Sequence, residues 1–384
     1  MRRSTAVCCA AILLAAMSGG SAASADPKVN PTLAAAASNV WVKLHEEAKD
    51  DPVRFMRQVH AGSCLDTRRS RIVIFGSDTH DMNWDNGPLF FDIPSATWSR
   101  AYPNDDKATY AVNAEGLPVA GEVGDHPWAM HTFGAVTYDA GRDEMVVCAF
   151  DPHCANGVLK ERWAKIGRHP TWTYSFADKR WRPLGCAATP VFAGACAWDA
   201  DRMVVIAYGE PGLWELGGEP RQWTKIAGKA LCGIHNNAVY DTKHKAFVSF
   251  GSWGNSNDVI VYRPAGPGGE IEHRKMPTPG LRPPADQHNP MCFDPGLGKV
   301  VVVVDRAAEG AKPDKATAAE TWLYDLGADA WTQVPTATLP FPCGMNYNMH
   351  YDPRHEACVL VVGQYMHPTT VYGLKLRPGR DTAR

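Results

Sequence analysis

Two stretches of the sequence place a His-Asn pair at the same distance from an aspartate. HNNAVYD begins at His235, and HNPMCFD begins at His288. An imidazole can move a proton near neutral pH or bind a transition metal, and an amide can hold a hydroxyl or a carboxylate by hydrogen bonds. The pair is therefore a candidate for acid–base catalysis, metal binding or ligand binding. Because it occurs twice, the elements that position it must be identified first.

The pair belongs to a longer repeat, in which an aromatic or apolar residue is followed by aspartate. The six aspartates are Asp66, Asp139, Asp199, Asp241, Asp294 and Asp352. Runs of β-forming residues such as RIVIFG and RMVVIAYG follow them, and most units close on a tryptophan. Four short strands separated by turns are typical of a β-propeller blade. We predict an all-β fold with six legible blades, whose aspartates cap the turns after the inner strands.

Both ends of this repeat are irregular. The last unit lacks a fourth strand, whereas residues 39–47 (NVWVKLHEE) have an outer-strand pattern ahead of the first unit. We expect this strand to complete the last blade and close the ring, which removes the sheet edges. Residues 101–130 lengthen the first interval; they form either an inserted loop, the interpretation we favour, or a degenerate seventh blade.

Propeller geometry turns the repeat into a site hypothesis, because residues before each inner strand converge near the axis on one face. These positions hold His60, Phe133, Ala193, His235, His288 and Asn346, and Tyr347 follows the last. The second and third blades supply apolar or small residues, so the polar positions form one contiguous arc over four blades. Neighbouring loops add a rim of Asp78, His131, His153, Trp253, Arg306 and Tyr365. Imidazoles, amides and aromatic rings together suit a sugar.

The strand and turn pattern resembles the kelch-repeat propellers of exported bacterial proteins. The similarity is carried by tyrosine-aspartate, a turn, RIVIFG, and later ETWLYDLGADAW, and it covers almost the whole chain after residue 25. Kelch units usually carry two glycines after the second strand, whereas here Gly76-Ser77 and Gly363-Gln364 stand there. The resemblance implies a kelch-like propeller and says almost nothing about activity.

The reaction we expect is β-elimination in a uronate-containing polysaccharide. His235 or His288 would remove the proton beside the uronate carboxylate, and Tyr347 or Tyr365 would protonate the leaving oxygen. The substrate would be bound by Asn236, Asn289, Arg306, His60, Asn346, Trp253, His131 and His153, the first three holding the carboxylate. Several propeller-fold polysaccharide lyases use histidine and tyrosine in this way, some with a metal; this is an analogy of fold alone.

Three alternatives stay open. A divalent metal ion can be shared by His60, His235 and His288, although no short ligand motif supports it. A non-catalytic propeller that binds glycan or protein would use the same rim. A copper-radical carbohydrate oxidase would need two tyrosines, two histidines and a tyrosine-linked cysteine, for which Tyr347, Tyr365 and Cys343 supply the residue types. The arc lacks the paired carboxylates of a hydrolase.

The N-terminus and the composition concern location and partners. Residues 1–25 have a basic start, a short apolar stretch and small residues, so we expect a cleaved signal peptide, a single propeller domain over residues 26–384, and a secreted or periplasmic protein. A net charge of −2 indicates no nucleic-acid partner, and no later stretch is apolar enough for a membrane span. Four loop cysteines, Cys154, Cys186, Cys232 and Cys343, are candidates for disulfides.

Overall fold

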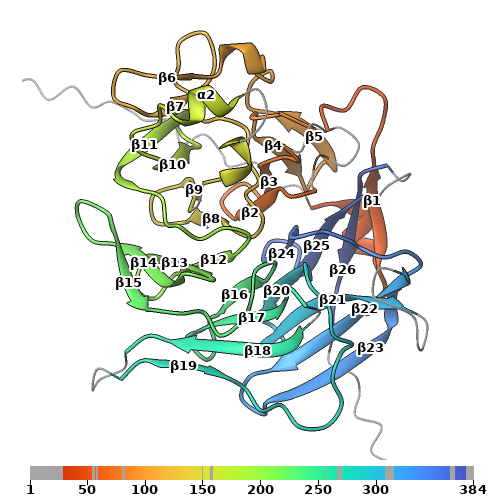
Figure 1. Cartoon of the computed structure of the whole chain (residues 1–384). Coiled ribbons are helices and arrows are strands. Elements are labelled where there is room, and N and C mark those ends of the chain that lie inside the picture. Colours follow the sequence, from red (N-terminus) through yellow and green to blue (C-terminus); the bar gives the residue numbers. More distant parts are fainter. Residues whose placement is uncertain are drawn as a thin grey trace, which may run out of the picture.

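The chain forms a ring of six blades. The computed structural model describes residues 29–53, 57, 59–79, 83–148, 150–155, 159–254, 256–265, 270–307, 315–363 and 368–377. Within these residues, six four-stranded antiparallel sheets surround one axis (Figure 1). The predicted all-β, six-bladed propeller is confirmed. The proposed signal peptide lies outside the described residues.

Each blade runs from an inner strand at the axis to an outer strand at the rim. The first blade consists of β2 (Gly62–Asp66), β3 (Arg71–Phe75), β4 (Leu89–Asp92) and β5 (Thr97–Arg100). The second consists of β8 (Val136–Asp139), β9 (Glu144–Val147), β10 (Pro170–Ser175) and β11 (Arg180–Ala187). The third consists of β12 (Ala195–Asp199), β13 (Val204–Gly209), β14 (Gly212–Gly217) and β15 (Gln222–Ala227). The fourth consists of β16 (Asn237–Asp241), β17 (Ala246–Ser252), β18 (Ser256–Arg263) and β19 (Glu272–Lys275). The fifth consists of β20 (Met291–Asp294), β21 (Lys299–Ala307), β22 (Ala316–Asp325) and β23 (Ala330–Leu339). The sixth consists of β24 (Met349–Asp352), β25 (Ala357–Val362), β26 (Thr370–Leu374) and β1 (Val42–Glu46).

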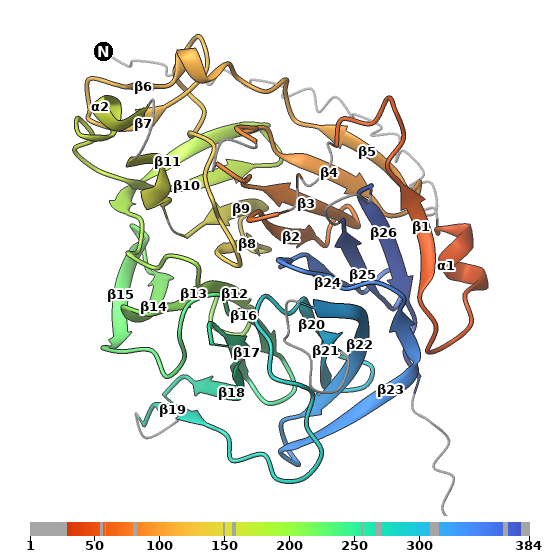
Figure 2. The ribbon, with the colours of Figure 1, turned by 45° about the vertical axis from the view of Figure 1, so that its right-hand side comes forward.

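The last blade takes its outer strand from the beginning of the chain, as predicted. Strand β1 pairs antiparallel with β26, from Val42 opposite Gly373 to Glu46 opposite Thr370. Figure 2 shows the two strands side by side, one at each end of the colour scale. Closing the ring in this way gives β26 a partner on each of its edges, β25 and β1.

The repeated aspartates end the inner strands and organise the turns that follow. Each of them is buried, and its carboxylate accepts backbone N–H groups two or three residues later. Asp241, for example, accepts the N–H groups of Lys243 and His244, both at 2.9 Å. This is the turn-capping role expected of aspartate, and it leaves these carboxylates on the face opposite the strand starts.

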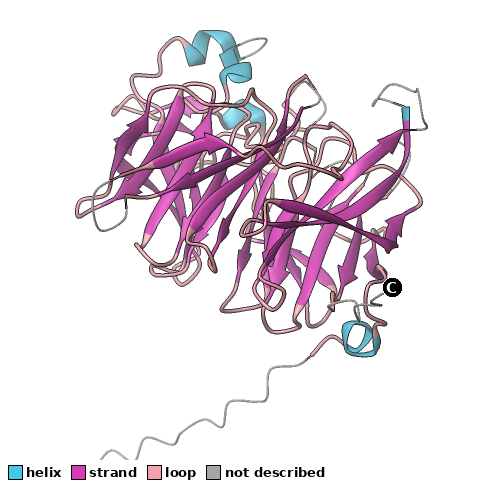
Figure 3. Cartoon of the chain, turned by 90° about the horizontal axis from the view of Figure 1, so that it is seen from below, coloured by secondary structure: helices cyan, strands magenta, loops and turns pink. Residues whose placement is uncertain are grey.

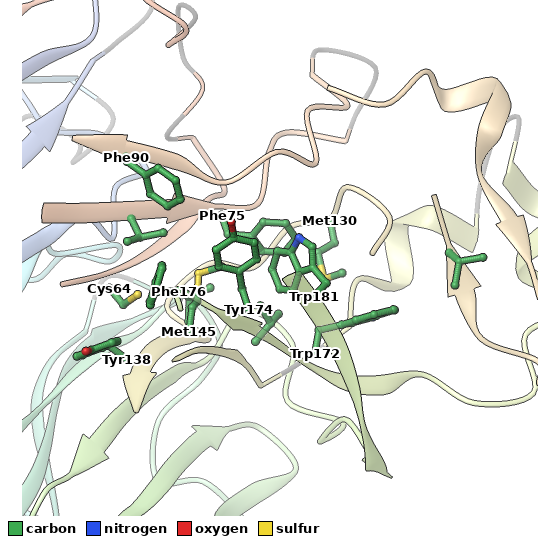
Figure 4. Close-up of a cluster of buried hydrophobic side chains, with 14 of the residues drawn as sticks. Cys64, Phe75, Phe90, Met130, Tyr138, Met145, Trp172, Tyr174, Phe176 and Trp181 are labelled. Carbon is green, nitrogen blue, oxygen red and sulfur yellow. The ribbon is translucent and has the colours of Figure 1, made fainter. Parts of the chain in front are cut away.

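The core consists of apolar layers between neighbouring blades. Side chains alternate along each strand, so Val73 and Phe75 of β3 pack toward the second blade, whereas Ile72 and Ile74 pack toward the last. The layer between the first two blades is rich in aromatic rings, among them Trp181 (Figure 4). Because both faces of every sheet are covered, the blades hold the strand starts in fixed positions.

Residues 101–130 contain a two-stranded ribbon, not a four-stranded sheet. Strands β6 (Ala111–Val112) and β7 (Pro118–Val119) pair with each other beside α2 (Lys160–Trp163). Figure 3 shows that the helical turns lie at the edge of the strand ring. The other helical turns are α1 (Pro31–Ala35), η1 (Lys107–Thr109) and η2 (Pro152–Ala155).

The cysteines behave as small core residues. All nine cysteines of the described residues are unpaired, and eight are buried. The suggested disulfides of Cys154, Cys186, Cys232 and Cys343 are therefore wrong; Cys154 and Cys343 instead pack in apolar clusters. In the described part of the chain, no helix has the length and apolar character needed to cross a membrane.

Candidate functional site

The positions before the inner strands share an unusual backbone conformation. His60, Phe133, Ala193, His235 and His288 all have a positive φ, between 47° and 61°. None is a glycine, so each costs about 1–2 kcal/mol relative to ordinary backbone. Strain of this kind persists only where the surrounding structure enforces it, and it clusters at functional sites.

Backbone hydrogen bonds connect these positions around the axis. The N–H of Phe133 donates to the carbonyl of His60 at 3.0 Å, and that of His235 donates to Ala193 at 2.6 Å. The N–H of His288 donates to His235 at 3.2 Å. The five residues therefore line the centre as the repeat predicted, and the left-handed turn lets each one bond its neighbour in the ring.

The sixth blade departs from the pattern by one residue. Asn346 is buried and structural: its amide donates to the carbonyl of Val361 at 2.9 Å and accepts from Asn348. Tyr347 occupies the centre instead, where its hydroxyl lies 3.0 Å from Nδ1 of His235. The predicted substrate contact of Asn346 is thus replaced by a tyrosine–histidine pair.

His235, His288 and Tyr347 form one half of the site. The imidazoles of His235 and His288 meet edge to face with centroids 4.5 Å apart, and His288 lies 5.7 Å from the Tyr347 ring. Nε2 of His288 has no hydrogen-bond partner among the described residues. This half brings together three of the four predicted catalytic residues; the fourth, Tyr365, lies outside the described residues.

Burial sets the protonation of this half. It lowers the pKa of His235 to about 4 and that of His288 to about 2, with nearby histidines adding to the effect. Burial also raises the pKa of Tyr347 well above its ordinary value. At neutral pH both imidazoles are therefore uncharged and the phenol is protonated, which are the states that a general base and a general acid require.

The other half is built by the first two blades and contains carboxylates. Nδ1 of His60 lies 3.3 Å from Oδ1 of Asp78, and Nε2 of His131 lies 3.4 Å from the same oxygen. Nδ1 of His131 lies 2.8 Å from Oδ2 of Asp151. Burial alone would lower the pKa of His131, but the hydrogen bonds to Asp151 and Asp78 outweigh it and raise the pKa.

Phe133 separates the two halves and touches both. Its ring centroid lies 5.4 Å from that of His60, 5.3 Å from that of His235 and 5.7 Å from that of Tyr347. The predicted arc is thus divided. His60 belongs with His131 and Asp78, so the suggested metal set of His60, His235 and His288 is not the one that the structure groups for a metal ion.

The predicted carboxylate-binding residues lie elsewhere. Asn236 and Asn289 are 0% and 1% exposed, beneath the surface of the site, and the amide of Asn236 donates to the carbonyl of Gly233. Arg306 pairs with Glu320, its Nε 3.1 Å from the carboxylate. Asn236 and Asn289 therefore offer a uronate carboxylate no surface contact, and the guanidinium of Arg306, although its side chain is 57% exposed, is paired with Glu320.

Two rim residues are placed beside the histidines. Trp253 is 61% exposed, and its ring lies 5.2 Å from that of His235. His153 packs edge to face on His131 at 4.9 Å, and its backbone N–H donates to Asp151. A groove of about 540 Å³ adjoins Trp253 and is lined by Lys229 and Lys275 among others. This size falls within the range of small-ligand sites.

Asp78 was predicted on the rim, whereas Asp151 was not predicted as part of the site. Asp151, two residues before His153, follows β9 in the stretch FDPH, which gave the only hint.

Asp286 and Asp305 form a second group of carboxylates: the N–H of Asp305 donates to Asp286 at 3.1 Å. Burial raises the pKa of Asp286 to about 6 and that of Asp305, with repulsion from Asp286, to about 7. Asp305 accepts two backbone N–H groups of the loop before β24 and so anchors it.

A different cavity opens on the opposite face. It measures about 350 Å³ and is lined by inner-strand residues and by turn residues such as Thr67 and Pro295. His350 lies there, hydrogen-bonded to Ser63 at 2.7 Å, and burial lowers its pKa to about 4. Tyr347 also lines this cavity, so it lies between the cavity and His235.

Comparison with known proteins supports the fold. No protein-family model and no curated relative in sequence matches the chain. Among solved structures, that of YjhT has a TM-score of 0.54 at 9% identity, covering 85% of this chain and 95% of that one. A protein of unknown function from Bacteroides thetaiotaomicron has a TM-score of 0.50 at 13% identity, covering 86% of this chain and 74% of that one.

A fungal alcohol oxidase in complex with copper is also similar, with a TM-score of 0.48 at 11% identity over 83% of this chain. The chain spans 62% of that oxidase's length. At such identities the likenesses to YjhT and to the Bacteroides thetaiotaomicron protein show a shared fold, and the activity of this chain must be argued from its own residues.

Proposed function

We propose that this protein is a polysaccharide lyase that cleaves a uronate-containing glycan by β-elimination. The observation that carries the proposal is the 3.0 Å hydrogen bond between Nδ1 of His235 and the hydroxyl of Tyr347 at the ring centre. It joins a neutral imidazole to a protonated phenol on one face. Export, and therefore access to such polymers, rests on the leader pattern of residues 1–25.

The pair can divide the two proton transfers of the reaction. With its Nδ1–H donated to Tyr347, His235 keeps a lone pair on Nε2, which takes the proton beside the uronate carboxylate. The electron pair of that C–H bond forms the carbon–carbon double bond, and the glycosidic C–O bond breaks. Tyr347 gives its proton to the leaving oxygen, so no water is consumed.

The same hydrogen bond restores the acid. After elimination, His235 carries two N–H groups and Tyr347 is a phenolate. Transfer of the Nδ1 proton across 3.0 Å returns Tyr347 to its protonated form. His235 is then neutral with its one proton on Nε2, and solvent that takes this proton while returning one to Nδ1 resets the base.

The entrance supports an acidic, ring-shaped substrate. Trp253 offers an exposed indole face beside His235, and aromatic faces suit the apolar face of a sugar. Lys229 and Lys275 line the adjoining groove, where ammonium groups attract carboxylates; Lys275 also pairs with Asp258. A chain of uronates would thus approach over Trp253 toward Nε2 of His235.

The test is elimination by the purified chain on a panel of uronate polymers, followed by ultraviolet absorbance of the unsaturated product. We expect product from at least one polymer, and loss of about 10²–10⁴ in rate for Tyr347→Phe. Tyr351→Phe, at the opposite face, is the matched control and should keep the activity.

Two outcomes would overturn the proposal. Glycan binding without any absorbance change would make the protein a binding module. Peroxide release from a copper-loaded sample would favour the oxidase alternative, for which His235, His288 and Tyr347 supply ligand types. Against that alternative, Cys343 packs in the cluster between the last two blades, whereas Tyr347 packs with Phe133.

A further inference from the structure

We propose that His60, Asp78 and His131 bind one divalent transition-metal ion, and that Asp151 orients His131 from behind. The three side chains come from the first two blades, and Asp78 lies in the segment after β3. Their ligand atoms lie within 4.8 Å of one another. Metal binding at this place is independent of the elimination chemistry proposed above.

The spacing of the donor atoms fits a tetrahedral ion. Oδ1 of Asp78 lies 3.3 Å from Nδ1 of His60 and 3.4 Å from Nε2 of His131. Zinc binds nitrogen and oxygen at about 2.0–2.1 Å, and the edge of a tetrahedron with such bonds is about 3.3–3.4 Å. The two measured edges therefore match an ion placed between these atoms.

Asp151 completes the arrangement as a partner of His131. Its Oδ2 lies 2.8 Å from Nδ1 of His131, which leaves Nε2 to face Asp78. The same oxygen accepts from the Thr79 hydroxyl and from the backbone N–H of His131, both at 2.8 Å. A metal-binding histidine usually donates its other ring N–H to a fixed carboxylate, which sets its tautomer and orientation.

These hydrogen bonds also decide between the two overlapping ligand groups. The other group consists of His131, Asp151 and His153. Asp151 would have to give up bonds to Thr79 and to backbone groups before it could bind an ion directly. Oδ1 of Asp78 already faces both His60 and His131, at 3.3 and 3.4 Å, so we assign the ion to the group that contains it.

Burial leaves the site open on one side. The His131 side chain is 0% exposed, whereas the side chains of Asp78 and His60 are 10% and 12% exposed. Three protein ligands with one remaining position are typical of catalytic zinc sites, whereas structural sites use four. The remaining position would accept water or an oxygen of a ligand.

If the proposed elimination is also correct, the ion acquires a role. Asn236 and Asn289 are buried and Arg306 is paired with Glu320, so an ion beside His60 would supply positive charge for the uronate carboxylate. The rings of His60 and His235 both pack on Phe133, so the ion and the base would face the same bound sugar.

The experiment is a cobalt(II) and zinc(II) titration of the full chain after removal of metals with a chelator. We expect one ion per chain and, for cobalt, the intense visible bands of tetrahedral coordination. Asp78→Asn and His60→Gln should each remove the bands and weaken zinc binding by at least about 100-fold, whereas Asp151→Asn should weaken it about 10–100-fold. The matched control is His45→Gln, because His45 forms a His–Asp pair on the outer strand of the last blade, 2.7 Å from Asp51.

Absence of binding by the wild-type chain, or unchanged affinity in both Asp78→Asn and His60→Gln, would overturn the assignment. Circular dichroism of each variant separates loss of the site from loss of the fold. The two proposals also fail differently. A bound ion without elimination refutes the lyase alone, whereas elimination by a chain that binds no ion refutes the metal site alone.

Discussion

The two halves of the central site place histidine at equivalent positions but surround it with different neighbours. His60 and His235 precede inner strands in the same left-handed conformation, and both pack on Phe133. On the first side, Asp78 and Asp151 raise the pKa of His131 despite its burial. On the second side, aromatic rings and a further imidazole surround His235, and burial lowers its pKa.

This difference shows what the repeat determines and what it leaves to the loops. The repeat brings a side chain to the axis, because each blade delivers its strand start to the same face. The neighbours then decide whether an imidazole is suited to a cation or to a proton. A carboxylate beside it favours ion binding, whereas an apolar pocket keeps it neutral and available as a base.

The comparison can be tested most strongly through activity. His235→Gln removes the proposed base, so elimination should fall by about 10²–10⁴-fold. Added zinc or cobalt should not restore it, because the loss lies in the half without carboxylates. The assay is initial rate with saturating uronate polymer. His350→Gln, a histidine of the opposite face whose pKa burial also lowers to about 4, should retain the rate; equal loss in both variants would contradict the assignment.

Removing the shared ring should weaken both halves together. Phe133 is 3% exposed and contacts both groups of side chains, so Phe133→Ala should lower the free energy of unfolding by about 3–5 kcal/mol. Urea unfolding measures this change. Phe133→Leu keeps most of the volume and should cost less than about 1.5 kcal/mol; equal destabilisation would show that volume is not what Phe133 supplies.

The pH dependence of stability should distinguish His235 from Asp305, because burial shifts their pKa values in opposite directions. Between pH 6.5 and about 4, histidines of the unfolded chain take up protons that folded His235 does not, so this group loses stability as the pH falls. Asp305 has the opposite sign. Its folded pKa of about 7 exceeds the ordinary 3.8, so its contribution is present at low pH and is lost as the pH rises through about 7.

Asp305→Asn should therefore remove the contribution that offsets the loss of stability caused by His235 as the pH falls. From pH 7.5 to about 5, the variant should lose stability more steeply than the wild type, by an amount on the order of 2 kcal/mol. The urea midpoint at each pH gives the comparison. Parallel curves for the two proteins would mean that the carboxyl group of Asp305 has an ordinary pKa.

The smallest effect is expected at the entrance. Trp253 is largely exposed, so Trp253→Ala should change stability by no more than about 0.5 kcal/mol. If the indole stacks on sugar, the KM should rise several-fold with kcat nearly unchanged, because the contact is equal in ground and transition states. Trp253→Phe is the control and should restore most of the binding. A fall in kcat alone would move Trp253 into the reacting centre.

The sequence was sufficient for the ring and for most of its central residues. Spacing from the repeated aspartates identified His60, Phe133, His235 and His288, because a fixed offset in a repeat becomes a fixed place on the axis. The offset failed at Asn346, where the side chain hydrogen-bonds within its own loop and the next residue reaches the centre. A shift of one residue cannot be read from spacing.

The partners of these residues could not be predicted in the same way. Asp78 was placed on the rim and Asp151 was not considered, since their contacts with His131 depend on how two separate blades meet. Arg306 was misplaced because β21 continues as a strand to Ala307, which carries the guanidinium along the hairpin to Glu320. The loop cysteines pack against apolar neighbours, and no local sequence pattern predicts these contacts.

The seam between β1 and β26 has a consequence for how the molecule is made. Val42 is synthesised near the start of the chain, yet its strand partner Gly373 comes near the end. The first strand must therefore wait, unpaired, until almost the whole nascent chain is available. Contacts of such long sequence separation are slow to form, so we expect seam closure to be the last kinetic event. Until then the exposed edge of β26 invites exchange with a second chain.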